Sequence, residues 1–263
     1  MNKEYKTLDV EFINQSVLIW LNRPHVHNAF NRDMIKELIH IISRIGDDKK
    51  IRSILISGRG KSFSAGADLN WMQESIGYSK QENMNDSALI SEMFHKLYTS
   101  AKPVISAVNG AAIGGGMGFI AVSDIVMAAQ SAVFGLSEVR IGLIPAVIST
   151  YLFRKSTSSR LRELFITGRR FNPETALEIG LINDVTDDDK LLEKAMEKVS
   201  EINSSGPDAV AACKKLFIEV PNMKISEAAE FTSELLATLR IGDEAQEGMR
   251  AFLEKRDPDW KDK

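Results

Sequence analysis

The sequence predicts an α/β fold with a mostly parallel sheet, followed by a helical C-terminal segment. Short apolar runs alternate with segments of helical period as far as residue 203, and beyond Pro207 only the helical period remains. Such alternation is typical of βαβ units and a parallel sheet. The run Ser204-Ser205-Gly206-Pro207 therefore divides the 263 residues into a core over 1–203 and a helical region over 204–263.

The elements follow from the spacing of apolar residues. Residues 7–21 are expected as two strands, because apolar positions alternate and Asn14-Gln15 is typical of a hairpin turn. Residues 31–46 place six apolar side chains on one helical stripe, and Asn31 is the expected N-cap. The same two periods predict strands over 51–56, 103–108 and 125–128, and helices over 68–76, 82–100, 146–155, 159–166, 173–179 and 188–203.

Composition excludes several classes of protein. Apolar residues make up 44% and charged residues 26%, as in globular proteins, and the net charge of −3 disfavours nucleic acid or an anionic membrane as partner. The single cysteine, Cys213, excludes an intrachain disulfide, and no apolar run is long enough for a membrane span. The start, Met1 to Tyr5, lacks the apolar region of a signal peptide, so a cytoplasmic location is expected. His25 and His27 have no third ligand at metal-site spacing, so no metal is expected.

Two glycine-rich turns each follow a predicted strand and lead into a helix. The first spans 62–69 (SFSAGADL) and the second spans 109–116 (NGAAIGGG). Small residues let a ligand approach the backbone and leave N–H groups free at a helix start. If the turns are adjacent, their N–H groups form an oxyanion hole for a thioester carbonyl. Two tight crossings that bind no ligand remain an equal alternative at this point.

Glu138 is the candidate acid/base. It lies in an apolar segment, Phe134 to Pro145, where partial desolvation would raise its pKa toward the range of a general acid/base. The alternative is a surface glutamate paired with Arg140.

Five motifs stand in order along the chain: Asn22-Arg23-Pro24 with Asn28-Ala29, Phe63 to Asp68, Gly110 to Gly116, Ser123 to Ile125 and Phe134 to Glu138. Taken together, they resemble the crotonase superfamily of enoyl-CoA hydratases and isomerases. The resemblance runs from about residue 8 to residue 262, with motifs in the family's order, and it implies a crotonase-like spiral of ββα turns with two roughly perpendicular sheets. It also implies a C-terminal helical region that builds trimers, often paired into hexamers.

The resemblance assigns roles to individual residues. The backbone N–H groups of Ala67 and Gly115 become the oxyanion hole, and Asp68 caps or orients the following helix. Phe252 and Lys255, in the tail, would reach the nucleotide of coenzyme A, commonly on a neighbouring subunit; ordinary helix packing and a solvated charge are the alternatives. The segment implied to contact coenzyme A near its adenine comprises Ala65, Gly66, Ala67, Asp68 and Leu69.

Gly118 departs from the usual pattern. Typical hydratases of the family carry a second glutamate there, so this chain keeps one carboxylate, Glu138, and the glycine is expected to leave open space. The flanking residues of 67–72, 115–119 and 136–149 are similar to bacterial methylglutaconyl-CoA hydratases of leucine breakdown and to carboxygeranoyl-CoA hydratases, which also have glycine there. A similar stretch occurs in dehydratases that build β-branches in polyketides. A cation near an acidic acyl group would be provided by Arg140 or Arg154.

The sequence therefore predicts an enzyme that adds water reversibly to a 2-enoyl-CoA thioester, with 3-methylglutaconyl-CoA as candidate substrate. Two alternatives remain: a Δ3,Δ2-enoyl-CoA isomerase that uses Glu138 alone, and a catalytically silent scaffold that binds coenzyme A or associates with RNA. No cofactor is expected, because coenzyme A is part of the substrate. The expected partners are the acyl-CoA thioester and further copies of the chain in a trimer or hexamer.

Overall fold

The computed structural model describes residues 5–261. Residues 1–4, on which the expectation about a signal peptide rests, lie outside that range. Two sheets form the core. The larger has the order β1-β2-β3-β5-β7-β10, in which β1 is antiparallel to β2 and the other neighbours are parallel. Its strands are β1 (Leu8–Ile13), β2 (Ser16–Leu21), β3 (Ser53–Gly58), β5 (Val104–Val108), β7 (Ile125–Ala129) and β10 (Asp184–Thr186).

A smaller sheet has the order β4-β6-β8-β9 and carries the functional turns. Its strands are only two or three residues long, too short to show an alternation in the sequence. The four strands are β4 (Ser62–Ser64), β6 (Ala111–Ile113), β8 (Val133–Gly135) and β9 (Arg170–Phe171).

The helices agree with the predicted spans to within a few residues. Asn31 caps the first helix by accepting a hydrogen bond from the Met34 N–H, as the sequence predicts. The helices of the core are α1 (Arg32–Gly46), α2 (Leu69–Ser75), α3 (Lys80–Thr99), α4 (Gly116–Val122), α5 (Ala146–Lys155), α6 (Ser159–Thr167), α7 (Pro173–Glu178) and α8 (Leu191–Asn203), and 3-10 turns lie at Pro24–Val26, Glu138–Ile141 and Asp188–Lys190.

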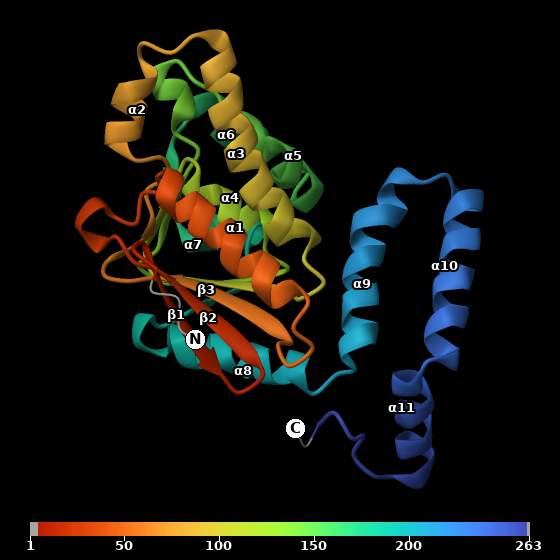
Figure 1. Ribbon diagram of the computed structural model, residues 1–263. Helices are drawn as coiled ribbons and strands as arrows, with labels where there is room; N and C mark the ends of the chain where they lie inside the picture. Colours follow the sequence, from red (N-terminus) through yellow and green to blue (C-terminus); the bar gives the residue numbers. More distant parts are fainter. Residues whose placement is uncertain (1–4, 262–263) are drawn as a thin grey trace.

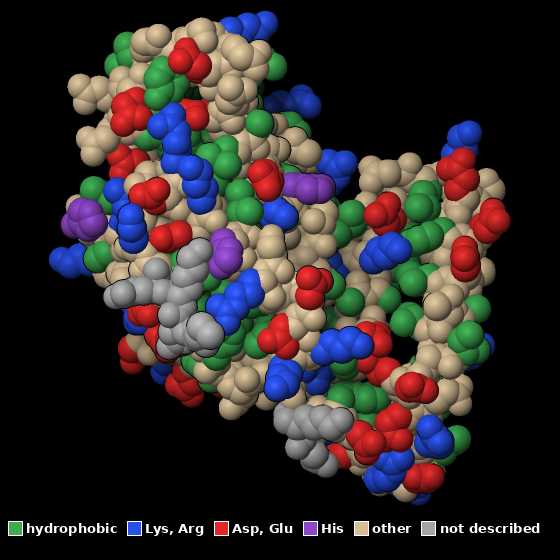
Figure 2. All heavy atoms as spheres, in the orientation of Figure 1, with side chains coloured by type: hydrophobic (Ala, Val, Ile, Leu, Met, Phe, Trp, Pro, Cys, Tyr) green, Lys and Arg blue, Asp and Glu red, His purple; other side chains and the backbone are tan. Residues whose placement is uncertain are grey.

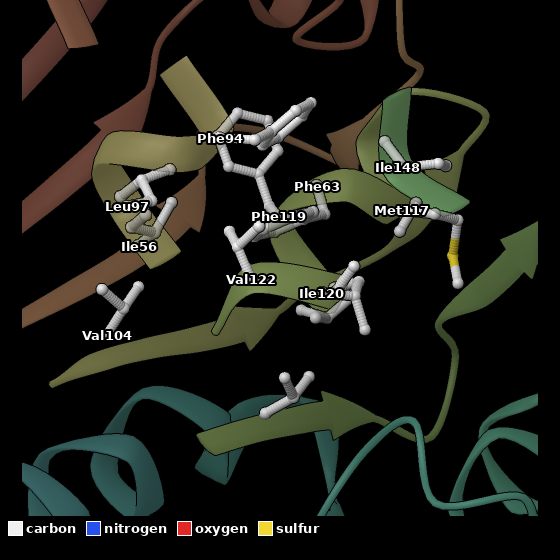
Figure 3. Packing of buried hydrophobic residues seen from close by; sticks show 14 of the residues in the cluster. Ile56, Phe63, Phe94, Leu97, Val104, Met117, Phe119, Ile120, Val122 and Ile148 are labelled. Carbon is white, nitrogen blue, oxygen red and sulfur yellow. The ribbon is translucent and has the colours of Figure 1, made fainter. Parts of the chain in front are cut away.

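Helices cover both faces of the larger sheet (Figure 1). Alternate strand residues point to opposite faces, so Val17 and Ile19 join the main core beneath α1, α3 and α4, whereas Leu18 packs on the side of α8. Figure 3 shows the centre of the main core, where the ring of Phe94 lies beside that of Phe119 of α4, with centroids 5.3 Å apart. Short helix α4 is buried at every residue, which fixes the backbone that follows the second glycine turn.

Beyond Pro207 the chain forms an arm beside the core (Figure 1). It comprises α9 (Pro207–Glu219), a 3-10 turn (Val220–Asn222), α10 (Ile225–Ile241) and α11 (Asp243–Glu254). Lys214 joins the arm to the core, because its buried Nζ lies 2.7 Å from Oδ2 of Asp124. Buried Arg52 donates to the carbonyls of Ser205 and Trp260 and so joins the base of the arm to β3.

Several large apolar side chains of the arm remain exposed, and Figure 2 shows hydrophobic side chains gathered on it. They are Phe217, Ile225, Leu236, Ile241, Met249, Phe252 and Leu253. No helix of the described residues combines the length and hydropathy needed to cross a membrane.

Candidate functional site

The two glycine turns meet because β4 and β6 are parallel neighbours in the smaller sheet. Gly66, at φ +88°, lies against the second turn so closely that a Cβ on it would be 2.8 Å from the Ile113 carbonyl oxygen and 3.0 Å from the Gly115 nitrogen. Only glycine permits both this left-handed conformation and this approach. The predicted adjacency of the turns is therefore present, through short strands that the sequence pattern does not reveal.

The backbone around Ala67 is held on both sides by Phe30. The Phe30 N–H donates to the Gly66 carbonyl over 2.8 Å, and the Asp68 N–H donates to the Phe30 carbonyl over 3.0 Å. Within residues 5–261 neither the Ala67 N–H nor the Gly115 N–H donates a hydrogen bond to the protein. Two adjacent donors are thus available to an oxygen atom of a ligand.

Glu138 begins the 3-10 turn after β8 and points back at the second glycine turn. Its Oε1 lies 3.4 Å from the position that a Cβ of Gly114 would occupy. Its Oε2 is buried and has no hydrogen-bond partner. Burial raises the pKa of Glu138, and a hydrogen bond from its own backbone opposes this only in part. The predicted desolvation is therefore confirmed.

The alternative pairing with Arg140 does not occur. No cation of the described residues lies within 4.0 Å of the Glu138 carboxylate. The Arg140 side chain instead lies against Gly168, where its Cγ is 3.1 Å from the position of an added Cβ. Glu138 consequently keeps its carboxylate free for a ligand.

One cavity of about 500 Å³ is lined by Ala67 and Gly115, which carry the two free N–H groups, and by Glu138. Glu138 is the single charged side chain among its described lining residues, and neither Arg140 nor Arg154 belongs to them. Such an apolar enclosure strengthens hydrogen bonds to a developing oxyanion. The lining comprises Phe30, Ala65, Ala67, Leu69, Met72, Asn83, Ser87, Ile90, Ile113, Gly114, Gly115, Ser137, Glu138, Ile141, Leu143, Ile144, Pro145, Ala146, Val147 and Ile148.

Asp68 is not among the residues that line this cavity, and it holds the first turn in place. It caps α2 by accepting from the Asn70 N–H, as predicted, and its Oδ2 lies 2.7 Å from Nη1 of Arg23. Burial alone would raise the pKa of Asp68, but the hydrogen bonds from Arg23 and Asn70 together with the charge of Arg23 lower it. Arg23 also donates to the Ala29 carbonyl over 2.6 Å, which joins the segment before Phe30 to the start of α2.

Comparison with known proteins identifies the family. The profile of the enoyl-CoA hydratase/isomerase family matches residues 12–263. The chain belongs to this family.

Curated relatives and solved structures agree with that assignment. The short-chain-enoyl-CoA hydratase of Clostridium acetobutylicum is 32% identical over 96% of this chain and 97% of its own. The 2,3-dehydroadipyl-CoA hydratase of Escherichia coli is 31% identical over 93% of this chain and 94% of its own. A crystal structure of an enoyl-CoA hydratase from Shewanella pealeana superposes with a TM-score of 0.93 at 36% identity, covering 98% and 97% of the two chains. The resemblance to the crotonase superfamily and its fold is confirmed, and the protein is an enzyme of the enoyl-CoA hydratase/isomerase family.

Gly118 does not leave the space expected for the usual second glutamate of the family. A Cβ added to it would lie 2.2 Å from Cζ of the Phe94 ring, which is fully buried. The expectation of open space was wrong, because Phe94, from α3, fills that position. Figure 3 shows this ring over α4.

Within a single chain, the two tail residues lie outside the lining of the cavity. Phe252, on α11, is 83% exposed, and Lys255 ends that helix in the left-handed region at φ 56°. Neither lines the cavity. Their contact with coenzyme A stays a prediction.

Three residues that contact the glycine turns or the ends of α4 were not identified from the sequence. Phe30 follows the Asn28-Ala29 motif directly, and that position could have marked it. Phe94 and Lys155 lie within helical patterns where nothing distinguishes them, because their roles depend on α3 and α5 packing against α4.

Proposed function

We propose that this protein adds water reversibly, in the syn sense, to a 2-enoyl-CoA thioester. The observation that carries the proposal is the meeting of two unpaired N–H donors and one desolvated carboxylate in a single apolar cavity. The thioester oxygen would accept hydrogen bonds from Ala67 and Gly115, which stabilise the enolate that forms when water attacks C3.

Glu138 would carry both proton transfers. Its carboxylate takes a proton from the attacking water while the new C3–O bond forms, and it then returns that proton to C2 as the enolate collapses. One carboxylate suffices for this sequence, because it is regenerated at the end. A raised pKa of Glu138 suits both proton transfers, because a carboxylate that is too weakly basic could not take the proton from water.

Isomerisation is the second candidate, and the lone carboxylate favours it. Glu138 would then remove a proton from C2 of a 3-enoyl thioester and deliver it to C4, through the same enolate. The relatives named as hydratases at 31–32% identity support hydration as the first choice.

Two observations favour different acyl groups. Motif similarity favours 3-methylglutaconyl-CoA, and one relative is named for a dicarboxylic acyl group, 2,3-dehydroadipyl. However, the described lining holds no cation that would pair with a second carboxylate, and this favours an uncharged acyl chain such as crotonyl.

A substrate panel tests these proposals. Crotonyl-CoA, 3-methylglutaconyl-CoA and a 3-enoyl-CoA are each followed by the absorbance of the conjugated thioester, which hydration removes and isomerisation creates. We expect loss of absorbance with the 2-enoyl substrates. Gain of absorbance with the 3-enoyl substrate alone would replace hydration by isomerisation. Binding of coenzyme A without turnover of any thioester would support a silent scaffold.

We also propose a homotrimer or hexamer in which the helical region over 204–263 contacts neighbouring copies. The exposed apolar side chains of the arm support this, since single chains rarely expose so many large apolar groups in one region. No nucleic acid, membrane or separate cofactor is invoked, and a cytoplasmic location remains a prediction from the sequence.

Replacement of Lys255 tests the tail. Lys255→Asn removes the charge, and asparagine tolerates the left-handed backbone at this position better than other residues with a Cβ. We expect KM for the enoyl-CoA to rise about fivefold, the effect of roughly 1 kcal/mol from one exposed ion pair, with kcat nearly unchanged. Lys194→Asn on α8, which removes a half-buried lysine paired with Glu197, is the control for loss of a surface charge away from the tail. An unchanged KM with the oligomer intact would assign the tail a structural role only.

A further inference from the structure

The C-terminal end of α4 is held by a lysine that does not reach the cavity. Nζ of Lys155 donates to the carbonyl of Ile120 over 2.8 Å and to that of Ser123 over 2.7 Å. The last carbonyls of a helix lack partners within the helix, and a buried carbonyl without a partner costs free energy. A cation also interacts favourably with the negative end of the helix dipole. Lys155 therefore satisfies both requirements at once.

The opposite end of α4 carries the Gly115 N–H. The backbone there is closely packed, because an added Cβ on Gly115 would lie 2.5 Å from the Phe30 ring and one on Gly116 would lie 2.3 Å from the Ser64 carbonyl oxygen. Since α4 has only seven residues, all of them buried, a shift at one end is transmitted to the other.

Lys155 is also the last residue of α5, whose first turn supplies Ala146, Val147 and Ile148 to the cavity wall. The Lys155 ammonium group thus joins α4, which begins directly after Gly115, to α5, which forms part of the cavity wall. Burial lowers the pKa of Lys155 to about 8, and the nearby charge of Asp124 opposes this. Its ammonium group is thus enclosed at this junction, although the side chain as a whole is only half-buried.

We propose that Lys155 is a positioning residue, which holds α4 against α5 and thereby aims the Gly115 N–H at the thioester oxygen. The proposal rests on the oxyanion role of Gly115 in the proposed function. It adds a residue that touches neither substrate nor reacting atoms.

The test compares Lys155→Met with Lys155→Arg. Methionine keeps much of the volume but cannot donate, whereas arginine retains charge and donors. We expect kcat for crotonyl-CoA to fall about tenfold to 10²-fold in the methionine variant, as for a misplacement of the order of 1 Å. KM should change far less, and the arginine variant should recover most of the loss.

A matched control separates positioning from general destabilisation. Lys214 is buried, and like Lys155 it donates hydrogen bonds to carbonyls; it also pairs with Asp124 but donates to neither Ile120 nor Ser123. Lys214→Met should therefore leave kcat per folded active site close to that of the wild type. An equal loss of kcat in both variants would overturn the proposal.

A spectroscopic readout reports on the donors directly. Butyryl-CoA labelled with ¹³C at the thioester carbonyl binds without reacting, and hydrogen bonds to the carbonyl lower its infrared stretching frequency. We expect a smaller lowering in Lys155→Met than in the wild type and an unchanged lowering in Lys214→Met. If Lys155→Met does not fold, Lys155→Gln, which is shorter and uncharged, is measured in the same way and should also show a smaller lowering.

The outcomes distinguish this inference from the function on which it rests. No lowering in the wild-type protein would refute the oxyanion hole itself. A normal lowering in the wild type that persists in the Lys155 variants, together with unchanged kcat, would refute the positioning role and leave the proposed function intact.

Discussion

Glu138→Gln is expected to lower kcat by about 10² to 10⁴, the range typical of general acid/base groups. The amide keeps the shape of the side chain but cannot take a proton from water. The binding of coenzyme A esters should hardly change, because the proposed role of the carboxylate is at the reacting carbons and not at the nucleotide. Exposed Glu193→Gln on α8 is the control, and near wild-type turnover in the Glu138 variant would eliminate this residue as the acid/base.

The same substitution should raise stability at neutral pH. Because burial raises the pKa of Glu138, folding favours the neutral form, and the wild type loses stability as pH rises from the unfolded-state value near 4.5 through the folded-state value. Glutamine does not ionise, so its Tm should exceed that of the wild type at pH 7 and the difference should shrink below about pH 4.5. For hydration, which requires the carboxylate, the acidic limb of kcat/KM should correspondingly lie above pH 4.5. A lower Tm for the variant at pH 7 would contradict the burial argument.

Gly118→Glu is expected to prevent stable folding. Even the Cβ would overlap the Phe94 ring, and overpacking of this kind costs about 1–3 kcal/mol before a charged group is added to a buried helix. Typical domains are stable by only about 5–15 kcal/mol. Thermal denaturation of Gly118→Ala and Gly118→Glu measures both costs. Gly46→Ala, at the end of α1 with nothing within 4 Å of the new Cβ, is the matched control and should be neutral or stabilising.

Rescue tests the cause of that loss. Phe94→Ala alone should destabilise by about 3–5 kcal/mol, because it opens a cavity in the core. The double variant Phe94→Ala/Gly118→Ala should lose less stability than the two single variants lose in sum, because the ring that the new Cβ meets is gone. Strictly additive losses would show that Phe94 does not occupy the place of the missing side chain. A stable and more active Gly118→Glu would show that the ring moves aside.

Local patterns determined most of the elements and part of the site. The helix over 31–46 with its Asn31 cap and the buried strands were predictable because their periods extend over several residues. The glycine turns and Glu138 were identifiable because small residues and a carboxylate within apolar segments are conspicuous in a sequence. In contrast, β4, β6, β8 and β9 are too short to show a period, although they bring the two turns together.

The sequence by itself determined the family, the α/β class, the oxyanion and acid/base candidates and the absence of a second glutamate at Gly118. Only the tertiary structure decided what occupies that position, because Phe94 lies 24 residues away on another helix and no spacing rule connects the two. The same holds for Lys155, which reaches the end of α4 from α5. Side-chain packing between elements is a property of their arrangement in three dimensions, and local propensity and periodicity do not encode which side chain fills a given space.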